Sequence, residues 1–214
     1  MDKKVVFQAS LFASLVAFIA VLVMGFGVRL PDPDVVVQPS LPSGPVAEFV
    51  RATNEYPDLA LRFFAADSLF VLSYMMVFVG LHAVVVGRAY TFAWLGLVMG
   101  VLTATLDAIE NAYFINYALL AQNGIPLAEP ALPLIFNLAN LKWMAAFATL
   151  YAFGLVWPRG SWLERVIVVL MLSFPLFGVL GVARPELVPY RGFYFFVGMP
   201  LFGWYFWQQT RRAE

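Results

Sequence analysis

The chain has no cysteine and a single histidine, His82, among its 214 residues. Without cysteine there are no disulfides, no thiolate nucleophile and no palmitoyl group. Zinc and haem sites take most of their ligands from cysteine and histidine, so one histidine argues against both. We expect His82 to be an interfacial or helix-packing residue, and we expect no cofactor.

Charge is scarce as well. Only 12% of the residues are charged, 62% are hydrophobic, and the mean hydropathy is +0.82. The formal net charge is zero, so there is no bulk electrostatic attraction to nucleic acid. Such a composition is far from that of a soluble domain and predicts an integral membrane protein that contacts membrane lipids.

Six apolar runs are each long enough for a bilayer crossing, which needs about 20 residues. They cover residues 5–28, 59–86, 91–121, 132–157, 163–182 and 191–208. The first run is longer than the core of a signal peptide and lacks its small-residue exit, so we expect a retained helix. In lipid the backbone must satisfy its own hydrogen bonds, which favours helices. The sequence therefore predicts an all-α integral membrane protein with one domain, residues 1–214, built as a bundle of six transmembrane helices.

Residues 29–58 form the longest predicted loop, and its two halves differ. The first half is punctuated by prolines and is expected to be extended. After Pro45, the apolar residues Val46, Phe49 and Val50 recur at helical spacing. This pattern predicts a short amphipathic helix at the outer membrane interface, which bridges two spans or caps a pocket.

The basic residues predict an orientation, because cytoplasmic loops carry an excess of Lys and Arg. In a six-span bundle one side holds Lys3, Lys4, Arg88, Arg159, Arg165, Arg211 and Arg212. The other side holds Arg29, Arg51, Arg62, Arg184 and Arg191. Seven bases against five favour both termini in the cytoplasm and the loop 29–58 outside. We expect a multi-pass protein of the cytoplasmic (inner) membrane.

The run 91–121 carries a polar stripe. Along one helical face lie Gly96, Gly100, Thr103, Asp107, Asn111 and Phe114, with Glu110 on the flank. Two glycines four residues apart allow another helix to approach closely. Since one face is both closely packed and polar, we expect Asp107 to face protein rather than lipid.

Lys142 lies in the following run, at a similar inferred depth to the acids. At 1.5 Å per residue, Asp107, Glu110 and Lys142 lie about 13 to 18 Å from the loop that joins their runs. An unpaired charge at that depth costs a few kcal/mol, so we expect Lys142 to pair with an intramembrane carboxylate. A third such acid, Asp67, lies in the second run on the same face as Tyr74.

Two asparagines complicate this pairing. Asn140 and Lys142 point about 160° apart on a helix, and Asn137 lies near Asn140. Either Lys142 curls around its own helix to reach the run 91–121, or the asparagines face that run and Lys142 meets Asp67 or another helix.

The intramembrane acids outnumber the one lysine, so at least one carboxylate must be protonated, hydrated or held by a ligand or cation. Each option needs space beside the carboxylate. We therefore expect a polar cavity in the outer half of the bundle, open toward the amphipathic helix and toward Arg184, Tyr190 and Arg191. The candidate ligand-binding residues are Asp67, Tyr74, Asp107, Glu110, Asn111, Asn137, Asn140 and Lys142.

Three functions fit such a site. The first is binding of a small polar or amphipathic molecule, or a lipid-like ligand, for uptake or transfer. The second is an intramembrane enzyme that acts on a lipid or isoprenoid with Asp107 or Glu110 as general base. The third is a packing subunit of a larger complex, in which the charges only set helix register. No metal is expected, because the oxygen ligands lack an established spacing and Lys142 competes with a cation. Protein partners stay open.

Two segments of the chain resemble segments of known membrane proteins. Ala9, Ala13 and Ala17, spaced by four residues, resemble the first helix of the substrate-binding subunits of energy-coupling-factor vitamin transporters. That resemblance covers one helix and implies a small six-helix protein with an outward-facing ligand site. The segment Leu-Asp-Ala-Ile-Glu-Asn-Ala at 106–112 resembles uncharacterised bacterial membrane proteins and implies no activity.

Overall fold

The computed structural model describes residues 2–27, 46–128, 132–184, 187 and 190–212. Within these residues the chain is all-α, with seven α-helices and no strand. The helices are α1 (Lys3–Leu22), α2 (Val46–Glu55), α3 (Pro57–Val85), α4 (Tyr90–Gln122), α5 (Pro133–Val156), α6 (Trp162–Ala183) and α7 (Tyr190–Arg212). A π-helical turn, η1 (Val23–Gly27), continues α1.

Local signals set where several helices begin and end. Ser161 and Glu164 form a capping box at the start of α6, each side chain bonding the backbone of the other. Proline occupies the first turn of α3 and α5, where its missing N–H leaves no bond unmade. Gly124 follows α4 with a φ of 78°, a left-handed conformation that suits glycine at a helix end. These boundaries leave short connections, so consecutive helices pack side by side.

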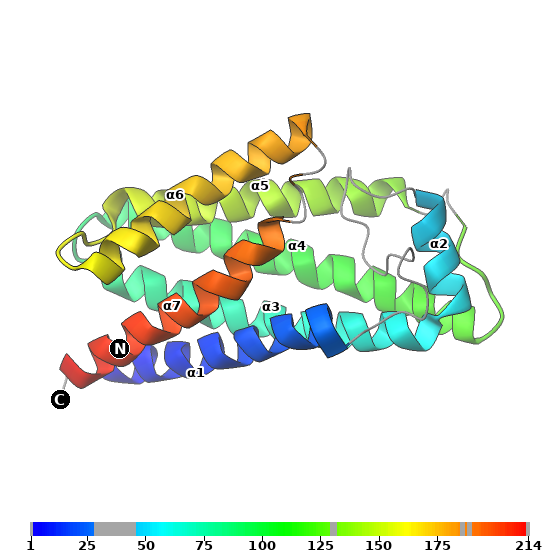
Figure 1. Ribbon diagram of the computed structural model, residues 1–214, viewed down its shortest axis with the longest axis horizontal. Coiled ribbons are helices and arrows are strands. Elements are labelled where there is room, and N and C mark those ends of the chain that lie inside the picture. Colours follow the sequence, from blue (N-terminus) through cyan, green and yellow to red (C-terminus); the bar gives the residue numbers. More distant parts are fainter. Residues whose placement is uncertain (1, 28–45, 129–131, 185–186, 188–189, 213–214) are drawn as a thin grey trace.

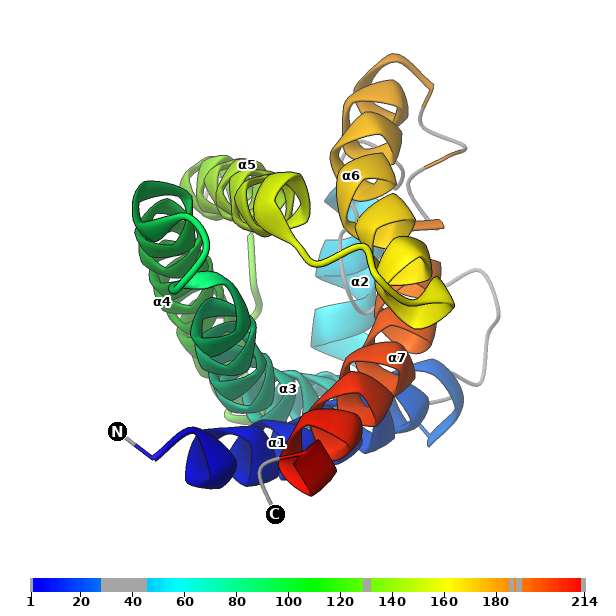
Figure 2. The same ribbon diagram turned by 90° about the vertical axis from the view of Figure 1, so that its left-hand side faces the viewer.

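The six long helices form a closed ring. Each packs against two neighbours, in the order α1, α3, α4, α5, α6, α7 and back to α1. Figure 2 views this ring from the end where both chain termini lie, and α2 lies across the opposite end (Figure 1). Of the six contacts between neighbours, the one between α6 and α7 is the sparsest. The ring encloses a central axis toward which every long helix can present side chains.

Four of the helices are long and apolar enough to cross a membrane. They cover Lys3–Phe26, Pro57–Val85, Tyr90–Gln122 and Trp162–Gly181, which makes the chain a multi-pass membrane protein. The predicted count of six spans is not confirmed. In α5, Asn137, Asn140 and Lys142 lower the mean hydropathy, and α7 is rich in Tyr, Trp, Gln and Arg.

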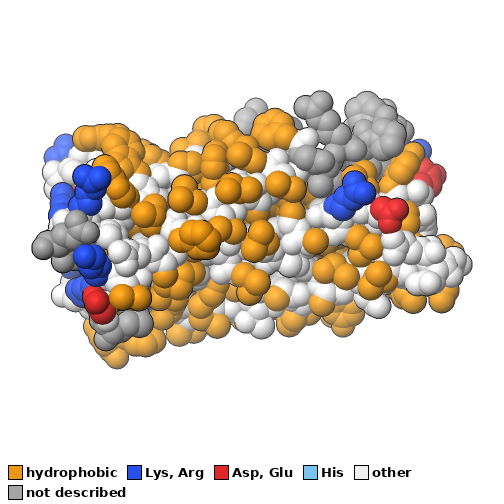
Figure 3. All heavy atoms as spheres, turned by 90° about the horizontal axis from the view of Figure 1, so that it is seen from below, with side chains coloured by type: hydrophobic (Ala, Val, Ile, Leu, Met, Phe, Trp, Pro, Cys, Tyr) orange, Lys and Arg blue, Asp and Glu red, His pale blue; other side chains and the backbone are white. Residues whose placement is uncertain are grey.

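The outer surface agrees with a lipid environment. In Figure 3, hydrophobic side chains cover the middle of the visible face, and charged side chains gather toward its two ends. Large apolar residues of the long helices are exposed, among them Phe12, Leu72, Met144 and Val169. A soluble protein seldom exposes so much contiguous apolar surface.

The predicted amphipathic helix is present as α2, but its apolar face packs on the bundle itself. Phe49 is 1% exposed and lies edge-on to Phe114, with 5.1 Å between ring centroids, and Phe114 stacks on Phe64. The Asn54 side chain also bonds both backbone groups of Leu127, at 3.1 and 2.8 Å. α2 is therefore anchored to α3, α4 and the loop after α4, rather than lying with its apolar side on lipid.

Candidate functional site

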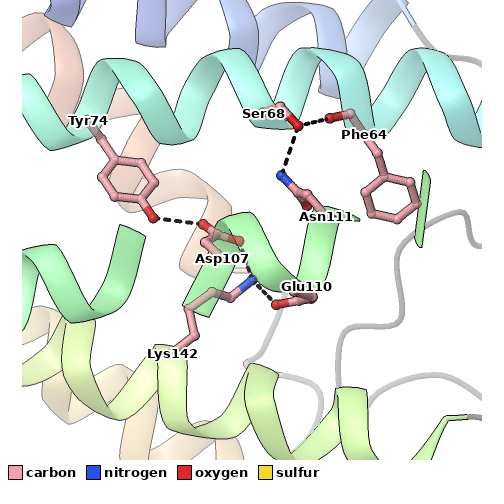
Figure 4. A network of polar contacts seen from close by, with 7 residues as sticks. All are labelled: Phe64, Ser68, Tyr74, Asp107, Glu110, Asn111 and Lys142. Carbon is pink, nitrogen blue, oxygen red and sulfur yellow. Dashed lines mark hydrogen bonds and ion pairs between the residues drawn. The ribbon is translucent and has the colours of Figure 1, made fainter. Parts of the chain in front are cut away.

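The centre of the polar site is an ion pair between α4 and α5. Lys142 Nζ lies 2.7 Å from Asp107 Oδ1 and 2.5 Å from Glu110 Oε2 (Figure 4). All three side chains are buried. The predicted pairing of Lys142 with an intramembrane carboxylate is thus confirmed, and the lysine contacts two carboxylates at once.

A tyrosine ties a third helix to this pair. The Tyr74 hydroxyl on α3 donates to Asp107 Oδ2 at 2.9 Å, and the ring is 4% exposed (Figure 4). Asp107 therefore accepts bonds from α3 on one oxygen and from α5 on the other. Asp107 thus links three helices, α3, α4 and α5, through its two carboxylate oxygens.

The packing of α4 explains why these side chains point inward. Its buried face follows the predicted stripe, which includes Gly96, Gly100 and Asp107. A Cβ atom on Gly96 would lie 2.6 Å from the Phe153 ring, and one on Gly100 would lie 2.7 Å from the Phe78 ring. The two glycines accommodate aromatic rings from α5 and α3, and this close contact turns the acidic part of the stripe toward both neighbours.

Asp67 is the carboxylate that the lysine does not contact. Its side chain on α3 is 6% exposed, and in the described part of the chain no Lys or Arg makes an ion pair with it. Asn111 reaches this carboxylate with its amide and also donates to Ser68 Oγ at 3.4 Å (Figure 4). The neutral amide of Asn111 therefore bonds Asp67, which makes no ion pair among the described residues.

These groups line a cavity of about 370 Å³ inside the ring. Its polar wall comprises Asp67, Tyr74, Thr103, Asp107, Glu110, Asn140, Lys142, Arg191 and Tyr194. Its apolar wall is rich in aromatic rings, including Phe63, Phe70, Phe78, Trp143, Phe174 and Phe195. Met24 of η1 and Arg191 at the start of α7 both contribute, so the cavity reaches the region where α1 ends and α7 begins.

Six of the eight predicted site residues line this cavity: Asp67, Tyr74, Asp107, Glu110, Asn140 and Lys142. The remaining two do not. Asn111 is buried beside Ser68, and Asn137 is exposed outside the cavity wall. Lys142 faces α4 directly, so it neither curls around its helix nor leaves α4 to the asparagines.

Arg191 is the residue whose position in the structure differs most from the one expected from the sequence. It was expected at the mouth of the cavity with Arg184, yet it is only 7% exposed and forms part of the wall. Arg184 is exposed and does not line the cavity, and the side chain of Tyr190 lies outside the described part of the structure. In the sequence Arg191 stands at the start of an apolar run. From that position an arginine side chain can turn inward to a cavity or outward to the membrane interface, so the sequence does not indicate its burial.

Among the described residues there is no cluster of three or more His, Cys, Asp or Glu side chains placed to hold a metal ion. His82 instead joins α3 to α4, with Nδ1 3.1 Å from the Ala93 carbonyl and its ring edge-on to Trp94. It serves helix packing, as the sequence indicated.

The alanine spacing of the first helix has a packing explanation. Ala13 and Ala17 are buried, and α1 packs closely against α3 and α7. Ser10 lies between these helices and donates to the Met76 carbonyl at 3.1 Å. Small residues on this face allow α1 to close the ring.

No protein-family model, no curated protein and no solved structure matches the chain.

Proposed function

We propose that the chain binds a small polar or amphipathic molecule in the cavity between its long helices, for uptake or transfer. One observation carries the proposal: a cavity of about 370 Å³ has three carboxylates, a lysine and an arginine in an otherwise largely apolar wall. Ligand pockets typically have volumes of about 300 to 1,000 Å³ and a few polar groups in an apolar lining. The cavity meets both descriptions.

The charges support binding over a purely structural role. Lys142 offsets only one of the two carboxylate charges that it touches, and a register-setting ion pair needs no adjoining space. Asp67 makes no ion pair among the described residues, so its charge requires a proton, water or a bound molecule. Polar groups that line a space inside a membrane helix bundle usually mark a site of binding or passage.

The orientation is part of the same proposal. We infer that α5 and α7 also cross the bilayer, since they complete the ring with the four apolar helices. Both termini then lie in the cytoplasm of an inner-membrane protein, and α2 lies outside. The end of α1 and the start of α7, which contribute Met24 and Arg191 to the cavity, would then face the outer side, and the cavity would open there.

Single-cysteine labelling tests this orientation cleanly, because the chain has no cysteine of its own. Ser40→Cys should react with an impermeant maleimide in intact cells, whereas Gly87→Cys and Gly160→Cys should react only after permeabilisation. Labelling of position 40 from the cytoplasmic side alone would contradict the proposed orientation.

The binding itself is tested on the intact protein purified in mild detergent. Native mass spectrometry should detect a co-purifying molecule, and Asp67→Asn should change its occupancy, because Asp67 lies on the cavity wall. The matched control is Glu55→Gln, which neutralises an exposed acid at the end of α2. If wild type and Asp67→Asn both carry no molecule, and other subunits co-purify instead, the chain is a packing subunit.

The geometry of Asp107 favours one alternative, an intramembrane enzyme acting on a lipid or isoprenoid. Asp107 lies on the cavity wall with Tyr74 and Lys142 at hydrogen-bonding distance, so a proton could move between the carboxylate and a bound substrate. Turnover of a candidate lipid that is lost in a folded Asp107→Asn variant would favour the enzyme. Retention of an unchanged molecule would favour the binder.

A further inference from the structure

We propose that the ligand of the cavity is a single-chain amphipathic anion, whose carboxylate or phosphate pairs with Arg191 and whose apolar chain lies along the seam between α6 and α7. This inference rests on the proposed function and names the class of ligand. It starts from the least satisfied group in the cavity wall.

Arg191 is a buried cation that makes no ion pair in the part of the chain that the structure describes. Its Nη2 donates to the Gly178 carbonyl at 3.3 Å, and its Nε has no acceptor among the described residues. Within the described residues no carboxylate makes an ion pair with it. The guanidinium lies over the Trp143 ring, 4.9 Å from its centroid, and 5.9 Å from that of Phe147.

These contacts leave the charge undercompensated. Arginine stays protonated in proteins, so Arg191 cannot escape the penalty of burial by losing its proton. A cation–π contact offsets only part of the free-energy cost of burying an unpaired charge. An anion that enters the cavity would supply the missing partner, and the planar fork of Arg191 suits the oxygens of a carboxylate or phosphate.

The other side of the cavity directs the anion to Arg191. Asp67, Asp107 and Glu110 all belong to α3 and α4, and they outnumber Lys142. An anionic group placed beside them would be repelled. Arg191 comes from α7, and its described contacts contain no carboxylate.

An exit for an apolar chain lies beside Arg191. On the outside of the bundle an apolar groove runs between α6 and α7, with Val169, Phe177 and Phe193 exposed along it. Leu170 and Tyr194 line both this groove and the central cavity. These two side chains therefore lie between the cavity and the groove, and the contact between α6 and α7 is the sparsest of the ring.

The polar links across this seam are few among the described residues. Tyr194 donates to Ser173 Oγ at 3.1 Å, Arg191 donates to the Gly178 carbonyl, and near the opposite ends of the two helices Tyr205 donates to Glu164 Oε1 at 3.4 Å. An anion bound to Arg191 would compete with the second link. A molecule already in the lipid could then enter with its head at Arg191 and leave its chain in the groove, without crossing water.

The experiment measures binding of three probes with the same chain length to the purified protein in maltoside detergent. Dodecanoate and dodecyl phosphate should raise the melting temperature and appear as bound species in native mass spectra, and dodecyltrimethylammonium should not. The stronger of the two anions identifies the head group. Arg191→Gln should weaken anion binding by at least about tenfold, since a charged hydrogen bond is worth about 1.5 to 3 kcal/mol and 1.4 kcal/mol is tenfold.

Arg184→Gln is the matched control, because it removes an exposed arginine close in sequence that does not line the cavity. It should leave anion binding unchanged. Equal anion binding by wild type and Arg191→Gln, or preferential binding of the ammonium probe, would overturn the inference while leaving the proposed binding function intact. Failure of all three probes and of any co-purifying molecule to bind would remove the proposed function as well.

A second measurement needs no change at Arg191. The acid 2-bromododecanoate carries its bromine next to the carboxylate, so it should quench the fluorescence of Trp143 beneath Arg191 in a saturable manner. The saturable part of the quenching should disappear in Trp143→Phe. If it persists unchanged there, the head group does not bind at Arg191.

Discussion

Lys142 and Arg191 are two buried cations in the wall of one cavity, and their surroundings differ sharply. Lys142 contacts the carboxylates of Asp107 and Glu110 at 2.7 and 2.5 Å. Arg191 contacts one backbone carbonyl and the faces of two aromatic rings. The exposed fractions, 6% and 7%, are nearly equal, so burial alone does not reveal which cation the protein itself neutralises.

The helices that carry the two cations explain the difference. α5 packs along α4, which presents its acidic stripe to Lys142. α7 begins beside the end of α6, whose described residues near Arg191 offer a carbonyl and no acid. A buried charge therefore supports the fold when its partner belongs to the neighbouring helix, and it points to a ligand when that partner is missing.

The largest expected effect separates the two cations directly. Lys142→Met should reduce the free energy of unfolding by about 3 to 5 kcal/mol, because it leaves two buried carboxylates without their cation. Denaturation in detergent micelles, followed by circular dichroism, measures this loss. Lys3→Met, which changes an exposed lysine at the start of α1, should stay within about 0.5 kcal/mol of wild type.

Removal of the carboxylates should restore much of that loss. Combining Lys142→Met with Asp107→Asn or Glu110→Gln should give a coupling energy of about 1 to 3 kcal/mol in a double-mutant cycle. The same cycle with Asp67→Asn should give a smaller coupling, since Asp67 is not in contact with the lysine. Strict additivity for both Asp107 and Glu110 would show that the ion pair does not operate in the membrane protein.

Tyr74→Phe should have a moderate effect. The variant removes the bond of 2.9 Å to Asp107 and leaves the ring packing in place, so a loss of about 1 kcal/mol is expected. Thermal unfolding provides the measurement, and Tyr113→Phe, on the opposite exposed face of α4, is the control. A loss as large as that of Lys142→Met would mean that Tyr74, and not the lysine, holds Asp107.

The smallest expected effect belongs to Arg191. In the ligand-free protein Arg191→Met should lower the free energy of unfolding by no more than about 0.5 kcal/mol, because a poorly compensated buried charge is replaced by an apolar chain of similar length. The same unfolding assay, after removal of bound lipids by extensive detergent washing, measures this. A loss of about 3 kcal/mol would assign Arg191 a structural role like that of Lys142.

The features that depend on local residue spacing could be predicted from the sequence alone. Helical periodicity placed Gly96, Gly100 and Asp107 on one buried stripe, and it located the amphipathic helix α2. The depth of Lys142 and the cost of an unpaired charge predicted its pairing with a carboxylate, which the structure contains. These inferences need only the geometry of one helix and the chemistry of the membrane interior.

The rotation of each helix toward its neighbours depends on tertiary packing. That rotation turned Lys142 to face α4, left Asn137 exposed, and buried the apolar face of α2 against α3 and α4. It also brought Arg191 into the cavity wall over the ring of Trp143 from α5, which lies far from it in the chain. Closure of the ring fixes these directions through many weak packing contacts between distant segments, and no local pattern in the sequence encodes their sum.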